Sequence, residues 1–271
     1  MKKRILFAAV GIPVLLIILF AAPEWATSAM CALLAAVASY ELMHAVGGAQ
    51  WKLLAAMPAF AALMTAAMGA PMLGIAPFWL LAGNFAVILY GFVMAIATHG
   101  REKQLGFATL AAGILSATVL PAGFASLALL RCVSPALAIA PLVGAFMSDT
   151  GAYFTGRALG RHKLCPYVSP NKTVEGSVGG FIGSVAGMII WHLVVKSTIS
   201  MDIGLATAAV LGLAGSALGQ IGDLSFSVIK REFGVKDYGT IFPGHGGVLD
   251  RFDSVLFVSP AYYLILLAVF A

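Results

Sequence analysis

Two aspartates lie inside long apolar runs of this chain of 271 residues. Asp149 occurs in GAFMSDTGAYFTGRALG, and Asp223 occurs in GQIGDLSFSVIKREFG. A carboxylate inside such a run is costly unless it is paired or binds a ligand, so each residue is a candidate for a functional site. A structural polar contact between helices is the alternative for either residue alone.

Each of the two aspartates is followed by further polar residues at helical spacing. The two series are Asp149, Tyr153, Gly156 and Arg157 in the first run, and Asp223, Ser227 and Lys230 in the second. Residues spaced in this way share one face of a helix. Each face therefore carries an acid deeper in the run and a base nearer its end.

A basic connection, GRALGRHKLCPYVSPNKTVEGSVGG, follows the first of these faces. Its basic residues are Arg157, Arg161, His162, Lys163 and Lys172. They precede a helix that Thr173 is suited to cap, and basic side chains beside a helix N-terminus make an anion site. The usual excess of basic residues in cytoplasmic loops explains Arg161 and Lys163. It does not explain why SPNKT leads directly into a glycine-rich run with Glu175 in its first turn.

A second polar connection, KDYGTIFPGHGGVLDRFDS, precedes the last apolar run. Glycines surround His245, so this backbone is free to adopt positive φ and to approach a ligand closely. Asp250 and Asp253 follow at a spacing of three, on one face of the predicted helix. Paired carboxylates suit Mg²⁺, which takes its other ligands from water and phosphate. A preference of acids for helix N-termini is the alternative, and it explains one aspartate more readily than two.

Bases, acids and glycine-rich backbone in these two connections point to metal-assisted phosphate chemistry. The chain has no G-x-x-x-x-G-K-[ST] motif and no zinc-type cluster of His and Cys. Cys31, Cys132 and Cys165 are an odd number without metal-type spacing, so we expect structural roles for them.

The elements that position these residues are predicted to be membrane-spanning helices. Hydrophobic residues make up 61% of the chain and charged residues 10%, and the mean hydropathy is +0.99. Such a composition indicates an all-α polytopic membrane protein, because lipid requires each span to satisfy its own backbone. We expect one integral membrane domain, with hydrophobic spans in 1–133 and the catalytic spans and loops in 134–271. The predicted spans are 5–22, 26–46, 52–70, 74–98, 105–130, 134–157, 174–195, 203–229 and 250–270.

The distribution of basic residues supports this count of nine spans. With the N-terminus in the cytoplasm, all 16 Lys and Arg residues except Arg131 and Lys196 fall on the cytoplasmic side. The C-terminus is then outside. The apolar run from Ile5 to Ala22 is long enough to span and lacks a small-x-small cleavage site after it, so we expect a retained helix. The net charge of +5 is explained by loops that face an anionic leaflet, without nucleic acid.

The run from Ser227 to Asp253 resembles the signature of the phosphatidate cytidylyltransferases, also called CDP-diacylglycerol synthases. That pattern is Ser-x-x-Lys-Arg, four residues, Lys-Asp, and then Pro-x-His-Gly-Gly-x-x-Asp-Arg-x-Asp. The matching positions are Ser227, Lys230, Arg231, Lys236, Asp237, Pro243, His245, Gly246, Gly247, Asp250, Arg251 and Asp253. The segment SDTGAYFTGRALGRHKLCPYVSPNKTVEGSVGG is similar to a second polar block of the family. The resemblance covers roughly the C-terminal half, since the first five spans resemble the family only in being hydrophobic.

The resemblance implies the reaction CTP + phosphatidate → CDP-diacylglycerol + pyrophosphate at a Mg²⁺-dependent site. Asp223 and Asp250 are the expected metal ligands, with Asp149 and Asp253 as further ligands or orienting partners. The expected phosphate clamps are Lys172, Lys230, Arg231, Lys236 and Arg251. His245 is expected to donate to a phosphate oxygen or to the leaving pyrophosphate, and a structural role in the turn is the alternative. Further candidates for substrate binding are Ser169, Asn171, Thr173, Ser227, Asp237, Gly246 and Gly247. The sequence leaves open whether a monovalent cation joins the Mg²⁺.

Three other functions are less consistent with these residues. A secondary transporter of an anionic substrate would have inverted repeats and charges near the middle of the membrane. Here the charges are expected at one face of the membrane, and they occur only in the second half of the chain. A CDP-alcohol phosphotransferase requires Asp-x-x-Asp-Gly-x-x-Ala-Arg, which is absent. A non-catalytic membrane scaffold does not require paired charges, which are costly to bury in a medium of low dielectric constant.

The expected partners are CTP, phosphatidate and membrane lipid, with no nucleic acid. The resemblance also implies a homodimer. We expect the protein in a bacterial inner membrane, with its active site on the cytoplasmic side.

Overall fold

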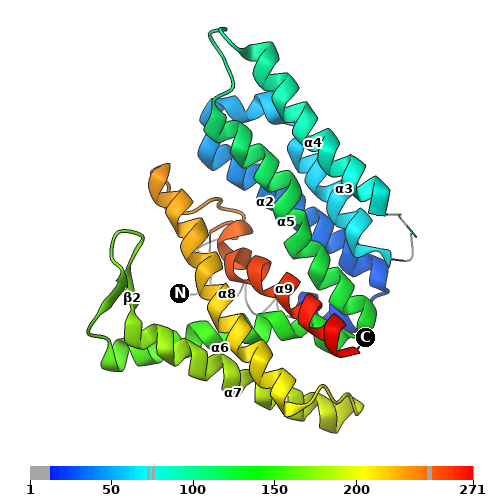
Figure 1. The fold of residues 1–271 in the computed structure, drawn as a ribbon, viewed down its shortest axis with the longest axis vertical. Coiled ribbons are helices and arrows are strands. Elements are labelled where there is room, and N and C mark those ends of the chain that lie inside the picture. The colour runs from blue at the N-terminus through cyan, green and yellow to red at the C-terminus, as the bar shows by residue number, and fades with distance from the viewer. Residues whose placement is uncertain (1–12, 72–73, 75–76, 243–245, 271) are drawn as a thin grey trace. The chain divides into compact units, whose positions relative to one another are not determined.

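The structure is a computed structural model that describes residues 13–71, 74, 77–242 and 246–270. Nearly all of the described chain is helical (Figure 1). The elements are α2 (Glu24–Gly47), η1 (Gly48–Leu54), α3 (Met57–Gly69), α4 (Pro77–Thr98), α5 (Phe107–Val133), α6 (Pro135–Leu159), β1 (Lys163–Cys165), β2 (Ser169–Thr173), α7 (Val174–Ile199), α8 (Leu205–Glu232) and α9 (Leu249–Phe270). The expected all-α fold is therefore confirmed, with one short β-hairpin in addition.

Seven helices within the described residues are long and apolar enough to cross a membrane: α2 with η1, and then α4 to α9. The predicted span 52–70 differs from the structure, because α3 has only 13 residues. Pro58 lies in the first turn of α3, where its missing N–H is tolerated, so the helix begins there and not at residue 52. Most of the predicted span 5–22 lies outside the described residues, and 13–20 are helical. The count of nine spans and the placement of the termini stay predictions.

The described chain folds into two compact units. The first contains the chain up to Cys132 together with Glu232–Phe252, and the second contains Val133–Arg231 together with α9 from Asp253 onward. The helix α9 therefore contributes its first turn to the first unit and the rest to the second. The single domain divided near residue 133 stays a prediction.

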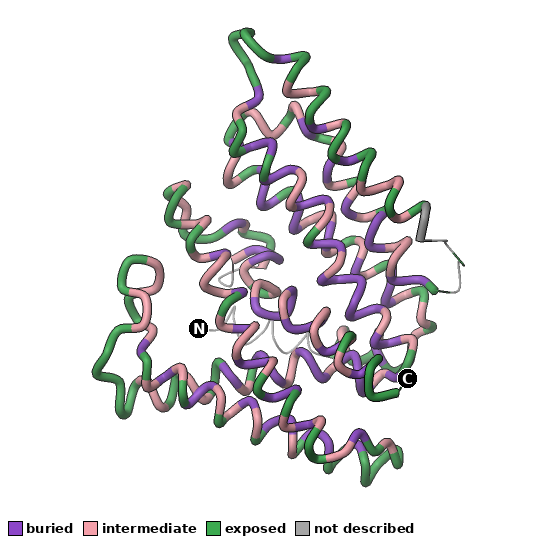
Figure 2. The backbone as a smooth tube through the Cα atoms, in the orientation of Figure 1, coloured by how far each residue is buried: buried purple, intermediate pink, exposed green. Residues whose placement is uncertain are grey.

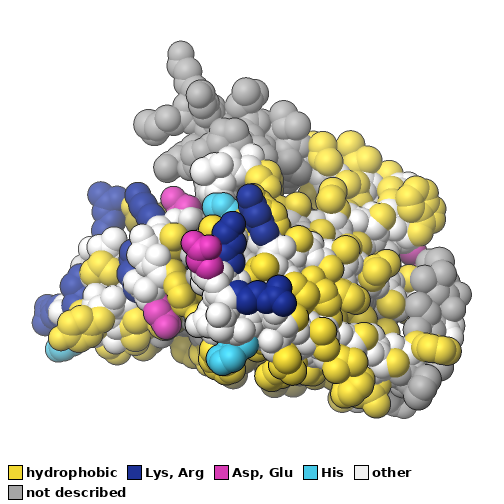
Figure 3. All heavy atoms as spheres, turned by 90° about the horizontal axis from the view of Figure 1, so that it is seen from above, with side chains coloured by type: hydrophobic (Ala, Val, Ile, Leu, Met, Phe, Trp, Pro, Cys, Tyr) yellow, Lys and Arg dark blue, Asp and Glu magenta, His cyan; other side chains and the backbone are white. Residues whose placement is uncertain are grey.

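In the first unit, α5 forms the interior and α4 lies at the outside, as the burial colours show (Figure 2). A core cluster joins Met43, Met57, Val87 and Leu110. Large apolar side chains of α4 are exposed along its length, Leu81 and Ile96 among them. Hydrophobic side chains also cover much of the surface in Figure 3. An apolar surface of this kind is what a helix facing lipid requires.

In the second unit, α6 and α7 lie side by side along their length (Figure 1). Glycines make this close approach possible: a Cβ added to Gly151 would overlap the carbonyl oxygen of Gly179, and a Cβ added to Gly183 would lie 2.5 Å from the Met147 carbonyl oxygen. The two backbones are therefore nearly in contact. This rigid pair carries Asp149 on α6 and the hairpin at the N-terminus of α7.

Candidate active site

The hairpin β1–β2 connects α6 to α7, in the segment that the sequence identified as a basic connection. Its strands pair antiparallel, with Lys163 opposite Thr173 and Cys165 opposite Ser169. At its end the Thr173 hydroxyl accepts a hydrogen bond from the Gly176 N–H at 3.1 Å. Thr173 is thus the N-cap of α7, as predicted, and the hairpin has a defined position on this helix.

Glu175, in the first turn of α7, binds back to the start of the hairpin. Its carboxylate accepts the N–H groups of Arg161 at 3.0 Å and His162 at 3.2 Å. Its Oε1 also lies 2.6 Å from Nδ1 of His162. The glutamate that the sequence singled out is therefore used to hold the hairpin in place.

A cavity of about 460 Å³ opens between the hairpin and the helices α6, α7 and α8. The lining residues are Asp149, Ala152, Tyr153, Gly156, Arg157, Leu164, Asn171, Lys172, Thr173, Gly176, Ser177 and Gln220. They include the whole polar face predicted for the first apolar run. Arg157 donates to the Tyr153 hydroxyl at 3.0 Å, which places its guanidinium beside the cavity.

An ion pair between Lys172 and Asp223 lies beside this cavity. Both side chains are half-buried, and the Ser227 hydroxyl donates to Asp223 Oδ1 at 3.2 Å. Asp223 also lies close enough to interact electrostatically with Asp149 and with Asp253. The second unit thus brings together three of the four aspartates predicted as metal ligands, with a lysine among them.

A chain of hydrogen bonds that the sequence analysis did not identify supports this cluster. Ser148 on α6 is 2.9 Å from Ser216 on α8, and Gln220 Nε2 donates to Ser216 at 2.9 Å. Ser177 on α7 donates to the Gln220 side-chain oxygen at 2.5 Å. These bonds connect all three helices. The sequence does contain a signal for these bonds. Ser216 and Gln220 are four residues apart and lie on the same helix face as Asp223.

The second polar connection is organised by Asp250 in the first unit. Its Oδ2 accepts the N–H groups of Tyr238 at 2.8 Å and Gly247 at 2.9 Å. Gly246 has a φ of +85°, in the region that favours glycine and that the sequence analysis expected here. Gly244 and His245 lie outside the described residues.

The remaining predicted site residues are distributed over both units. Lys236 and Asp237 line a second cavity of about 640 Å³, together with Tyr40, Glu41 and His44. Arg231 donates to the Val168 carbonyl at the hairpin at 3.1 Å. Ser169 lies in β2, Lys230 on α8 and Arg251 on α9.

The carboxylates of the second unit fit a cation that relies on few protein ligands. Among the described residues, no group of three or more His, Cys, Asp and Glu side chains is arranged to hold a metal ion by itself. Mg²⁺ commonly binds one or two carboxylates and completes its shell with water and substrate phosphates. Like charges held near one another, as in Asp149, Asp223 and Asp253, favour the approach of such a cation.

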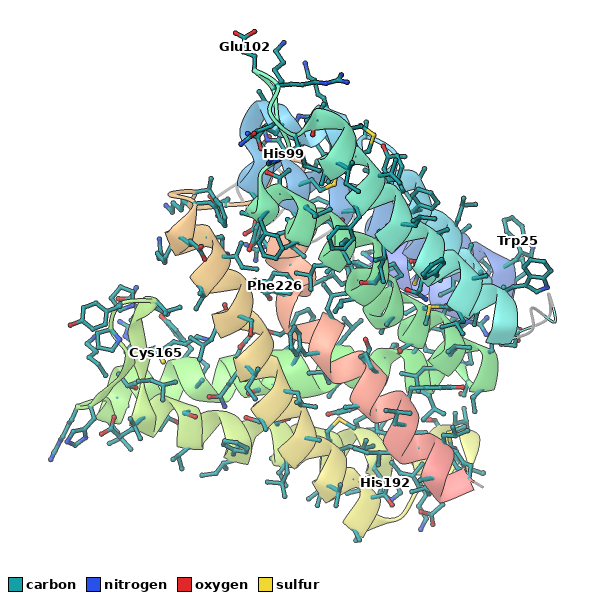
Figure 4. All side chains as sticks on the ribbon, turned by 45° about the horizontal axis from the view of Figure 1, so that its top comes forward. Trp25, His99, Glu102, Cys165, His192 and Phe226 are labelled. Atoms are coloured by element: carbon teal, nitrogen blue, oxygen red, sulfur yellow. The ribbon has the colours of Figure 1, made fainter. Side chains whose placement is uncertain are left out.

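The far end of the second unit carries a separate charged group. Figure 4 shows His192 on α7 well away from Cys165 on the hairpin. There Asp202 lies 2.6 Å from Lys196, and this partner holds the pKa of the Asp202 carboxyl below its usual value. Asp149 at the cavity is therefore distinct from this group, which lies in the link between α7 and α8.

Comparison with known proteins agrees with the resemblance. A family model described as the cytidylyltransferase family matches residues 2–269. A phosphatidate cytidylyltransferase of Staphylococcus saprophyticus is 39% identical over 184 residues, which are 68% of this chain and 69% of that protein. The protein of the same name from Staphylococcus haemolyticus is 37% identical over 182 residues, 67% of this chain and 68% of its own length. The one from Bacillus subtilis is 48% identical over 119 residues, which are 44% and 43% of the two chains.

Proposed function

Because this chain belongs to the cytidylyltransferase family, we propose that it transfers the cytidylyl group of CTP to phosphatidate. The products are CDP-diacylglycerol and pyrophosphate. The observation that carries the proposal is the cavity of about 460 Å³, which is lined by Asp149, Arg157 and Lys172 at one end of apolar helices. A lipid phosphate and a polar nucleotide must meet at such an interface.

The reaction is an in-line displacement at the α-phosphorus of CTP. A phosphate oxygen of phosphatidate forms the new bond to this phosphorus while the bond to the bridging oxygen of the β-phosphate breaks, and pyrophosphate leaves. The nucleophile is already an anion, so no strong general base is required. Positioning and charge stabilisation then supply most of the rate enhancement.

The basic side chains are assigned to the phosphates. Lys172 lines the cavity, is paired with Asp223 and interacts electrostatically with Asp149, and Arg157 lines the same cavity. Lys230, Arg231, Lys236 and Arg251 complete the proposed set of clamps, which stabilise charge as it moves to the leaving group. His245 is the proposed donor to a phosphate oxygen or to the departing pyrophosphate.

The cytosine, ribose and phosphate contacts are assigned to the hairpin and the connection. Asn171 and Thr173 line the cavity, and Ser169 precedes them in β2. Ser227, Asp237, Gly246 and Gly247 are the further candidates that the resemblance supplies. Ser227 already orients Asp223 by its hydrogen bond.

Asp223 and Asp250 are the proposed ligands of Mg²⁺, with Asp149 and Asp253 beside Asp223. Bound Mg²⁺ would neutralise phosphate charge and orient the triphosphate. The backbone N–H groups of Tyr238 and Gly247 orient the Asp250 carboxylate, and Ser227 and Lys172 orient that of Asp223. Such partners hold a ligand in one direction before a metal binds.

The proposed placement is a bacterial inner membrane, with nine spans, the N-terminus inside and the site on the cytoplasmic side, in a homodimer. Hydrogen bonding supports the clustering of basic loops within the first unit. The side chain of Gln50 accepts the Gly106 N–H at 3.1 Å and the Thr109 hydroxyl at 3.2 Å, which joins the segment of Lys52 to the loop 99–106. Loops that carry an excess of Lys and Arg are cytoplasmic.

The test is incorporation of radiolabelled CTP into chloroform-extractable lipid by the purified full chain with phosphatidate and Mg²⁺. We expect labelled CDP-diacylglycerol, and we expect none when phosphatidate is left out or when EDTA is added. If folded protein makes no labelled lipid under the complete conditions, the proposed reaction is wrong. Persistence of activity in EDTA would overturn the metal requirement and leave the reaction itself standing.

A further inference from the structure

Glu41 is a buried carboxylate in α2, in the half of the chain to which the sequence assigned no chemistry. Its residue surface is 2% exposed. Its Oε1 accepts the Val248 N–H at 3.1 Å, and its Oε2 accepts the Leu249 N–H at 2.9 Å. A single side chain from α2 therefore binds two consecutive amides at the start of α9, both within the first unit.

The two amides need such a partner. The first N–H groups of a helix have no acceptor inside it, and Leu249 is the first residue of α9. Both residues are buried, at 2% and 0% exposure, so water does not reach them as a substitute. A carboxylate accepting from a helix N-terminus makes charge-assisted bonds and interacts favourably with the helix dipole.

Two glycines of the connection leave the room that Glu41 occupies. A Cβ added to Gly239 or to Gly247 would overlap the Glu41 carboxylate. Neither glycine has positive φ, whereas Gly246 does, so the requirement at 239 and 247 is for space. The space that Glu41 requires explains why the motif has glycine at position 247.

Glu41 and Asp250 together bind three consecutive amides. Asp250 accepts from Gly247, and Glu41 accepts from Val248 and Leu249. The two carboxyl groups also lie close enough to interact electrostatically. The direction of the Asp250 side chain thus depends on a segment whose other two amides are held by Glu41.

We propose that Glu41 is a positioning residue that fixes Gly247–Leu249 and, through them, the carboxylate of Asp250. Only the expected effect of Glu41 on kcat rests on the proposed function, because the structural role of Glu41 does not depend on the reaction. Glu41 acts through the backbone and through Asp250, not on the substrate. Through Glu41, the helix α2 in the N-terminal half of the chain would help to position Asp250.

The first test is amide hydrogen exchange of the purified full chain, which requires no activity. Glu41→Gln keeps the side-chain size but places an amide N–H against the two backbone donors. We expect peptides that contain Val248 and Leu249 to exchange about tenfold faster or more, because their protection depends on these bonds. Glu24→Gln, at the other end of α2, is the matched control and leaves this segment unchanged. Unchanged exchange in Glu41→Gln would overturn the proposal.

The second test separates positioning from general stability. We expect Glu41→Gln to lower kcat about 10- to 100-fold per folded protein, with KM for CTP changed by less than about twofold. Glu24→Gln keeps the wild-type kcat. A fall only in the yield or thermal stability of the protein, with kcat intact, would reduce Glu41 to a structural role and overturn the proposal.

A double-mutant cycle then tests whether Gly239 and Glu41 act through one contact. A Cβ at position 239 displaces the carboxylate in the Gly239→Ala variant, but it has no carboxylate to displace when Glu41→Ala is also present. We therefore expect the double variant to be no more than about twofold less active than Glu41→Ala alone. Fully multiplicative losses would show independent roles and contradict the proposal.

Two further outcomes are distinguished by this design. If the wild type makes no CDP-diacylglycerol, the proposed function fails while hydrogen exchange still decides the role of Glu41. If Glu41→Gln gives no monodisperse protein, Gly239→Ala displaces the same carboxylate and takes its place in both tests, with the same expected results.

Discussion

Asp250 and Asp253 are three residues apart at the start of α9, yet they belong to two differently organised regions. In the first unit, Asp250 accepts two backbone N–H groups of the connection. In the second unit, Asp253 accepts the N–H of its own neighbour Ser254 at 2.7 Å, and it interacts electrostatically with Asp149, Asp223 and Lys230. A carboxylate bound to amides fixes the shape of the backbone, whereas one among other charges contributes to the potential that a ligand meets.

The same contrast extends to the neighbours of these two aspartates. Glu41 in the first unit is also occupied by backbone amides, and Asp223 in the second is bound by a lysine and a hydroxyl. Substitution of these carboxylates in the first region is therefore expected to change the conformation of the backbone that they bind. The second is expected to respond through the charge that it presents to phosphate and metal.

The largest effect is expected from Asp223→Asn in the charged region. The variant removes one charge from the proposed Mg²⁺ site and the partner of Lys172, and we expect kcat to fall by about 10³-fold or more. Incorporation of label from CTP into lipid measures this loss. Asp202→Asn, in the same unit but in the link between α7 and α8, is the matched control and retains activity. An Asp223→Asn variant that stays within tenfold of the wild type would remove Asp223 from the site.

Asp250→Asn tests the other half of the comparison. Its amide oxygen can still accept the N–H groups of Tyr238 and Gly247, so the change removes the charge while it keeps the shape of the connection. Because we also propose Asp250 as a metal ligand, we expect a loss of about 10²-fold in kcat and a higher Mg²⁺ concentration at half-maximal rate. Titration of the rate with Mg²⁺ measures both. Wild-type kinetics in this variant would limit Asp250 to holding the backbone.

Lys172→Met removes the base that is paired with Asp223 and interacts electrostatically with Asp149. We expect about a 10²-fold lower kcat/KM for CTP, because a phosphate charge loses its partner at the cavity. Steady-state kinetics at several CTP concentrations provide the measurement. Lys196→Met, at the exposed end of α7, serves as the control for loss of a lysine. Equal kinetics of the two variants would show that the ion pair is only structural.

The smallest effect is expected at Asp202, whose pKa is lowered chiefly by its hydrogen bond to Lys196. Because the folded-state pKa lies below the ordinary value, the pair stabilises the protein above that value and this contribution is lost as the pH falls through the lowered pKa. The pair is exposed, so the apparent Tm of Asp202→Asn should differ from the wild type by about 1 °C or less near pH 6. That difference should shrink as the pH falls from 6 toward and through the lowered pKa, as thermal unfolding over a series of acidic pH values would show. A difference that grows toward acid would contradict the assignment.

The sequence was sufficient for features that depend on local chemistry. Long apolar runs require helices in lipid, and the seven helices of suitable length follow from them. The spacing of Asp149, Tyr153, Gly156 and Arg157 placed them on one face, and all four line the cavity. Thr173 was identified as a cap because only a local hydroxyl is needed for this bond.

Other features were not accessible in this way. The hairpin β1–β2 has strands of three and five residues, too short for a periodic pattern. The span predicted over 52–70 was too long, because the apolar run after Lys52 continues from the end of the 3₁₀ segment across Pro58 without a polar residue.

What the sequence by itself determined is the class of the protein and the chemistry of its polar residues, since composition, helical period and motif spacing are properties of the chain alone. The tertiary structure decided which partner each charged side chain meets. Glu41 and Val248 are 207 residues apart, and no period or propensity relates such positions. Their hydrogen bond exists because packing brings α2 against a buried helix N-terminus, where an amide without an acceptor is costly.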